Sequence, residues 1–93
     1  MYSDYEIRKA MTREETMQCF APFDFSKVAS LDNFDILQLH KIRIMIFDRI
    51  EVLWEATWID GELRKNTEDE QNEWNNLTNL SEHINKKLRL YHD

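Results

Sequence analysis

The 93-residue chain has one glycine, one proline and one cysteine. An all-β protein of this size needs several tight turns, and such turns depend heavily on glycine and proline. A single cysteine cannot form an intramolecular disulfide, and a single glycine cannot supply the glycine-rich loop of the usual nucleotide sites. Composition alone therefore favours a mainly helical protein without such a loop.

Long apolar runs are also missing. No stretch reaches the ~18 uncharged apolar residues that a membrane-spanning helix needs. The first residues, MYSDYEIRKAM, lack the apolar core of a secretion signal. We therefore expect a soluble protein of a reducing compartment, the cytoplasm, with no membrane partner.

Metal-binding and nucleophile patterns are absent from the sequence. His40, His83 and His92 are not spaced four residues from one another or from a carboxylate, and there is no second cysteine, so the zinc patterns are missing. Cys19 has no histidine nearby in sequence, and we expect it to be a small buried apolar side chain. We predict no metal, no cofactor and no catalytic residue.

The chain is instead rich in apolar and acidic residues. Its hydrophobic content of 42% is too high for a disordered chain, and its length predicts one domain, residues 1–93. The net charge is −6, and residues 44–85 hold ten acidic against three basic side chains. Such a surface disfavours nonspecific binding to nucleic acid or anionic lipid.

The N-terminal segment carries a helix-start signal. Ser3 and Glu6 have the spacing of a capping box, in which each side chain hydrogen-bonds the other residue's backbone amide. Thr12 and Glu15 have the same spacing and are compatible with a fresh start. We predict one helix near residues 4–19, with a possible break near residue 12.

An aromatic connector follows this helix. Pro22 disfavours helical geometry in the residue before it, so the chain is expected to turn here. Phe20, Phe23 and Phe25 are too apolar for a solvated linker. We expect all three to fold down onto the core.

Residues 31–60 form the longest apolar segment. Ile42, Ile44 and Ile46 alternate with other side chains as in a strand, and Asp60-Gly61 would suit a two-residue hairpin turn. The alternation then fails, and the run far exceeds an ordinary strand. We therefore prefer a helix over residues 31–60, capped by Ser30 or Asp32 and ended by Gly61 in left-handed geometry.

This long helix has more apolar surface than a surface helix needs. Its apolar arc spans roughly 200°, about double the ~100° stripe that is usual. The aromatic side chains that extend the arc are Phe47, Trp54 and Trp58. Five side chains gather on the opposite, polar side: His40, Lys41, Asp48, Glu51 and Glu55.

The last segment, residues 67–91, is predicted as a helix with Thr67 and Glu70 as its capping box. Its apolar residues step by three and four as in a heptad seam. The short link 61–66 predicts that this helix folds back antiparallel to the long helix. The seam consists of Trp74, Leu77, Ser81, Ile84, Leu88 and Tyr91, of which Trp74 is assigned to the core.

The predicted fold is an all-α three-helix unit with a long central helix and an antiparallel C-terminal helix. The two neighbouring helices cover only about half to two-thirds of the apolar arc of the central helix. We therefore expect another surface to cover the rest, either a second copy in a helical homodimer or a different protein. The predicted partner-binding residues are Phe47, Trp54, Trp58, Glu51 and Glu55.

The leading functional hypothesis is a non-enzymatic protein–protein interaction module: a small acidic regulator, an inhibitor or an antitoxin-like protein. One alternative is a small dimeric enzyme with an intersubunit site built from Arg43, Arg49, Glu51 and Glu55. The structural explanation of Arg43 and Arg49 is interhelical ion pairing, and Glu51 and Glu55 are expected on the solvent side of the long helix.

A second alternative is nucleic-acid binding through the basic end of the chain. Lys86, Lys87 and Arg89 gather there. Cations also suit the C-terminal end of a helix, so these residues have an explanation without a ligand. Binding of this kind would weaken steeply with added salt.

Overall fold

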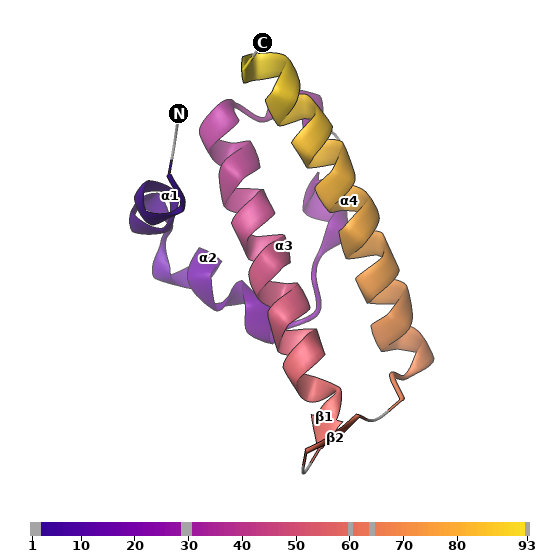
Figure 1. The fold of residues 1–93 in the computed structure, drawn as a ribbon. Coiled ribbons are helices and arrows are strands. Elements are labelled where there is room, and N and C mark those ends of the chain that lie inside the picture. The colour runs from indigo at the N-terminus through magenta and orange to yellow at the C-terminus, as the bar shows by residue number, and fades with distance from the viewer. Residues whose placement is uncertain (1–2, 29–30, 60, 64, 93) are drawn as a thin grey trace.

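The computed structural model describes residues 3–28, 31–59, 61–63 and 65–92, and within them the protein is all-α (Figure 1). Two short helices, α1 (Asp4–Ala10) and α2 (Arg13–Met17), precede two long ones, α3 (Ile36–Ala56) and α4 (Glu68–His92). The connecting chain contains three 3₁₀ turns: Gln18–Phe20, Phe25–Val28 and Leu31–Asn33. The predicted all-α class is confirmed.

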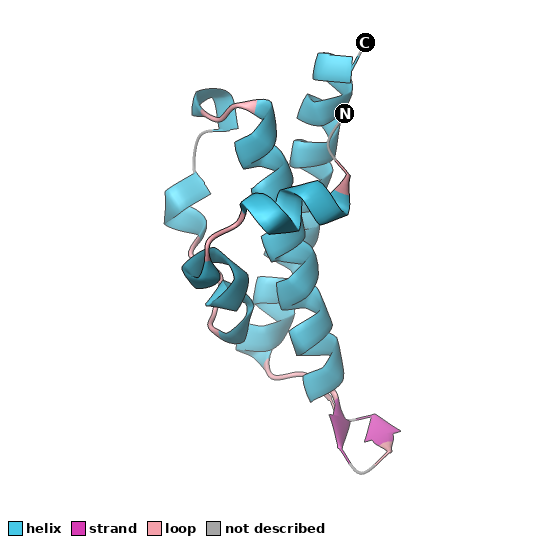
Figure 2. Ribbon diagram, turned by 90° about the vertical axis from the view of Figure 1, so that its left-hand side faces the viewer, coloured by secondary structure: helices cyan, strands magenta, loops and turns pink. Residues whose placement is uncertain are grey.

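Helices α3 and α4 lie side by side and antiparallel, as the short link between them predicted (Figures 1 and 2). The main core lies between them. Three residues of the predicted seam, Leu77, Ile84 and Leu88, are buried there. The buried residues of this core are Val28, Leu39, Ile42, Ile46, Leu53, Leu77, Ile84 and Leu88.

The aromatic connector covers one side of this core. Phe23 and Phe25 pack against it, with ring centroids 4.9 Å apart, as predicted. Phe20 is exposed, so its predicted burial is wrong. It ends the 3₁₀ turn in which Cys19 is the buried residue, and neighbouring residues of a helical turn point in different directions.

The predicted helix over residues 4–19 is two helices. Met11 is extended (ψ 144°), and Thr12 begins α2 with a complete capping box to Glu15. Helix α1 crosses α3 steeply (Figures 1 and 2), and a second small core joins Ile7 and Met11 to Ile44 of α3. The short N-terminal arm therefore covers a second side of α3.

Helix α3 begins later than predicted. Asp35 is its cap: its carboxylate accepts a hydrogen bond from the Gln38 amide at 2.8 Å, and the Asp35 amide donates to Gln38 Oε1 at 3.0 Å. The predicted start at residue 31 is wrong because Leu31–Asn33 forms a separate 3₁₀ turn, and the Asp32 carboxylate pairs with Lys87 instead. Ser30, the other predicted cap, lies outside the described residues.

Helix α3 also ends earlier than predicted, at Ala56. Strands β1 (Trp58–Ile59) and β2 (Glu62–Leu63) form a short antiparallel hairpin with Trp58 opposite Leu63. Gly61 has the predicted left-handed geometry (φ 79°), but it serves the hairpin turn. The hairpin interpretation was therefore right for this segment and wrong for the apolar run before it.

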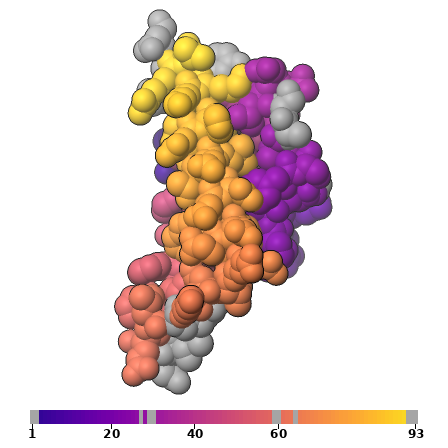
Figure 3. All heavy atoms as spheres, turned by 90° about the vertical axis from the view of Figure 1, so that its right-hand side faces the viewer, coloured from indigo at the N-terminus to yellow at the C-terminus, as the bar shows by residue number. Residues whose placement is uncertain are grey.

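Helix α4 begins as predicted. The Thr67 hydroxyl accepts from the Glu70 amide at 3.2 Å, and a Glu70 carboxylate oxygen lies 3.0 Å from that hydroxyl. The hairpin projects beyond this end of the α3–α4 pair (Figure 3).

Candidate interaction surface

Helix α3 presents three different sides. Successive residues of a helix are about 100° apart, so Ile42, Ile46 and Leu53 share the side that packs on α4. Ile44 points to α1, and Asp48, on the same side, pairs with Arg8 of α1 at 2.8 Å. The side between these two directions carries Phe47, Glu51, Trp54 and, just beyond the helix, Trp58; we call these four residues the α3 strip.

The α3 strip is open to solvent. Phe47 is 55% exposed, Trp54 50% and Trp58 45%. Fully burying a large apolar side chain contributes about 1.5–3 kcal/mol, and each of these three gains only part of that from its own chain. The expectation that a single chain leaves them uncovered is confirmed.

Tryptophan rings join the strip to α4. Trp54 meets Trp58 edge-on, with centroids 5.7 Å apart and planes at 79°, and meets Trp74 at 6.4 Å and 67°. These are favourable aromatic geometries and hold the exposed rings in place. Trp74 is partly buried and packs on the core, as predicted, while one side faces the strip.

A groove of about 250 Å³ opens beside these rings. Leu63, an exposed residue that sequence reasoning left in a link, reaches it from β2. The available signal was the Asp60-Gly61 turn, which places Leu63 opposite Trp58. The residues that line the groove are Trp54, Thr57, Leu63, Asn66, Gln71 and Trp74.

The strip has negative charge that is only partly offset, because Arg8 attracts Glu51. Glu51 lies within it and Glu55 at its edge; both are exposed, and neither forms an ion pair within the described residues. The Asp48 side chain is only 16% exposed and is neutralised by Arg8. His40, which was predicted on this polar side, is buried. The N-terminal arm covers this part of α3, where Asp4 pairs with Arg43 and Arg43 lies 3.3 Å from His40 Nδ1.

Arg49 is the centre of a buried polar network. Its guanidinium donates to both carboxylate oxygens of Glu73, at 2.7 and 2.9 Å, and to the carbonyl of Cys19 at 3.1 Å. Glu73 also accepts from the Phe23 amide at 3.0 Å. One ion pair thus connects α3, α4 and the connector.

Arg49 and Glu73 each stabilise the charged form of the other side chain. Burial raises the pKa of Glu73, but the hydrogen bonds from Arg49 and Phe23 outweigh it, so the pKa lies below its usual value. The hydrogen bond to Glu73 raises the pKa of Arg49. Cys19 is buried, as predicted, and burial raises the pKa of its thiol.

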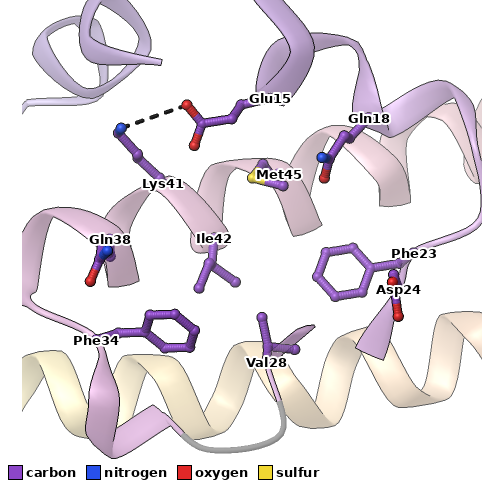
Figure 4. Close-up of a pocket in the computed structure, with 10 residues that line it drawn as sticks. All are labelled: Glu15, Gln18, Phe23, Asp24, Val28, Phe34, Gln38, Lys41, Ile42 and Met45. Atoms are coloured by element: carbon purple, nitrogen blue, oxygen red, sulfur yellow. Dashed lines mark ion pairs between the residues drawn. The ribbon is translucent and has the colours of Figure 1, made fainter. Parts of the chain in front are cut away.

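A second groove, of about 260 Å³, lies between α2, the connector and α3 (Figure 4). Ile42 of α3 points into it from one side, and Val28 and Phe34 from the chain before α3 point into it from the other, as Figure 4 shows. Glu15 and Lys41 face each other across its rim at 3.6 Å. These two titratable side chains neutralise each other.

The basic end of α4 is partly used within the chain. Lys87 pairs with Asp32, while Lys86 and Arg89 are exposed. Among the described residues, no three histidine, cysteine or acidic side chains gather as a metal site. No helix in the described ranges combines the length and apolar character needed to cross a membrane.

Comparisons with family models, curated proteins and solved structures found no match to this chain. The function must therefore be inferred from the surface itself. On that surface, the α3 strip combines large exposed aromatic side chains with unpaired charge.

Proposed function

We propose that this protein is a non-enzymatic interaction module, a small acidic regulator that binds another protein through the α3 strip. The observation that carries the proposal is the line of three half-exposed aromatic side chains, Phe47, Trp54 and Trp58, on one side of one helix. Exposed tryptophan is characteristic of binding hot spots, and large contiguous apolar patches mark interaction sites.

Charge favours a different protein over a second copy. In a two-fold contact through the strip, Glu51 and Glu55 of both copies would approach one another without a cation of the strip to neutralise them. A partner with a cationic surface would neutralise them, and the net charge of −6 would speed its approach. The homodimer remains a prediction, and we place it second.

The enzyme and nucleic-acid alternatives receive less support. Arg49 is mostly buried and donates to Glu73 and to the Cys19 carbonyl, so its guanidinium is not open to an anionic substrate, and Arg43 is paired with Asp4. Lys87, one of the three basic residues at the end of the chain, is paired with Asp32.

The test is affinity capture from the native host with a matched pair of variants. Phe47→Ser/Trp58→Ser removes two aromatic side chains of the strip. Tyr5→Ser/Leu90→Ser removes two apolar side chains outside it that are even more exposed. The intact mass of each captured complex is then measured, together with the thermal unfolding of each variant.

We expect the first pair alone to lose a co-purifying protein, with both variants folded. Retention of that protein by Phe47→Ser/Trp58→Ser would refute the proposed surface. A mass equal to two copies of this chain, reduced to one by the same variant, would show that the strip is a homodimer interface instead.

A further inference from the structure

The spacing of the strip matches the contact face of a packed helix. Its members follow one another at intervals of four, three and four residues, from Phe47 through Glu51 and Trp54 to Trp58. The buried seam of α4 has the same three-and-four spacing where it packs against α3. A row of this kind fits between the side-chain ridges of another helix.

The two neighbours of α3 leave room for such an element. Helix α4 packs on one side of α3. On the side that carries the strip, α1 covers only the part of α3 that ends at the Asp4–Arg43 and Arg8–Asp48 ion pairs. Beyond Asp48 the strip is open as far as the hairpin. From Phe47 to the end of α3 at Ala56 it spans about 14 Å at 1.5 Å per residue, roughly two and a half helical turns, and Trp58 lies just beyond.

The side chains of the strip indicate which side chains a docking partner must present. Phe47, Trp54 and Trp58 require apolar anchors at three- and four-residue spacing, and the groove beside Trp54 and Trp74 accepts one large apolar side chain. Glu51 and Glu55 require cations beside those anchors. An extended peptide is a poorer fit, because β2 has two residues and offers little edge for strand pairing.

We propose that the element docking on the α3 strip is a basic amphipathic helix, with an apolar seam flanked by lysine or arginine. This inference rests on the proposed function and adds the class of partner. It predicts that helical pattern and positive charge are both needed for binding.

The probes are three synthetic peptides of about 14 residues, roughly 21 Å long as helices. The first has leucines at heptad spacing flanked by lysines, the second has glutamate for each lysine, and the third is a scramble of the first. Binding is followed by the three tryptophan indole NH cross-peaks in ¹⁵N–¹H spectra and by helix gain in circular dichroism.

Two charge-reversal variants complete the design. Glu51→Lys/Glu55→Lys inverts the charge of the strip. Glu14→Lys/Glu82→Lys makes the same change in net charge at exposed positions on α2 and α4, outside the strip. The matched pair separates local complementarity from the overall field of the protein.

We expect the basic patterned peptide to gain helix and to shift the Trp54 and Trp58 signals, binding at least about tenfold more tightly than the other two, or about 1.4 kcal/mol. Glu51→Lys/Glu55→Lys should invert the preference toward the acidic peptide. Glu14→Lys/Glu82→Lys should keep the original preference.

Equal binding of the scrambled peptide, an unchanged preference after charge reversal in the strip, or no indole shift at millimolar peptide would overturn the inference. These outcomes are separable from failure of the proposed function. If captured host protein still depends on Phe47 and Trp58 while the helical peptide fails, the strip is the binding surface and its occupant is not a basic helix.

Discussion

At the residue scale, the Arg49–Glu73 pair is the polar contact on which the fold depends most. Its side chains are only 11% and 13% exposed, and their hydrogen bonds also involve the connector. Removing one partner of such a pair leaves a buried charge without compensation, which costs more than the intact pair contributes. The Arg43–Asp4 pair differs, because the Asp4 side chain is 70% exposed.

Arg49→Met should therefore lower the free energy of unfolding by roughly 3–5 kcal/mol, whereas Arg43→Met should lower it by less than about 1 kcal/mol. The double variant Arg49→Met/Glu73→Met should recover much of the loss, since no charge is then left unpaired. Urea denaturation measures all three. Equal losses for Arg49→Met and Arg43→Met would contradict this account.

Glu73 should also set part of the acid sensitivity. Because its pKa is lower in the folded chain, the unfolded chain binds the proton more readily. The resulting stability is complete above the ordinary glutamate pKa of about 4.3 and is lost as the pH falls through the lowered folded value. Glu73→Gln should flatten the fall in unfolding free energy below about pH 4.3, as measured by urea titrations from neutral to acid. An unchanged slope would exclude this role.

At the element scale, the sequence predicted elements best where local signals agreed. Thr67 and Glu70 were assigned correctly because cap, acidic first turn and seam all pointed to one helix. Local signals competed at the ends of α3. Asp35 displaced Asp32 as the cap because Gln38 completes a capping box, while Asp32 pairs with Lys87 far along the chain.

The burial of single side chains was harder to predict. His40 lies on a side of α3 that periodicity alone leaves polar, and only the crossing of the N-terminal arm buries it. Interhelical ion pairing was expected for Arg49, but its partners Glu73 and Cys19 lie 24 and 30 residues away. Contacts at such separation depend on the relative placement of elements, which helical periodicity does not specify.

Substitutions of Gly61 test the hairpin that carries Trp58, the last residue of the strip. Its φ of 79° is unfavourable for residues with a Cβ, and a Cβ there would meet no atom within 4 Å, so the expected cost is conformational only. Gly61→Ala should weaken the Trp58–Leu63 pairing by roughly 1 kcal/mol. Gly61→Asn should weaken it less, because asparagine tolerates left-handed geometry. Amide exchange across the hairpin measures both; identical exchange in the two variants would argue against a conformational origin.

At the scale of the whole molecule, the sides of α3 differ in what covers them. Helix α4 buries one side, the N-terminal arm buries a second, and the side that carries the strip stays exposed. The sequence indicated this surplus because the apolar arc of the central helix exceeds what two neighbours can cover. It did not indicate Leu63 as part of the surface, because that depends on the hairpin. The central claim is that another protein binds the strip and covers its aromatic side chains.

Site-specific photo-crosslinking in the native host tests this claim most directly. A benzophenone amino acid replaces Phe47 in one variant and Tyr5, an exposed aromatic residue of α1 outside the strip, in the other. We predict that position 47 crosslinks to a different protein and that position 5 does not. A crosslink from position 47 only to a second copy of this chain, or equal crosslinking from both positions, would contradict the claim.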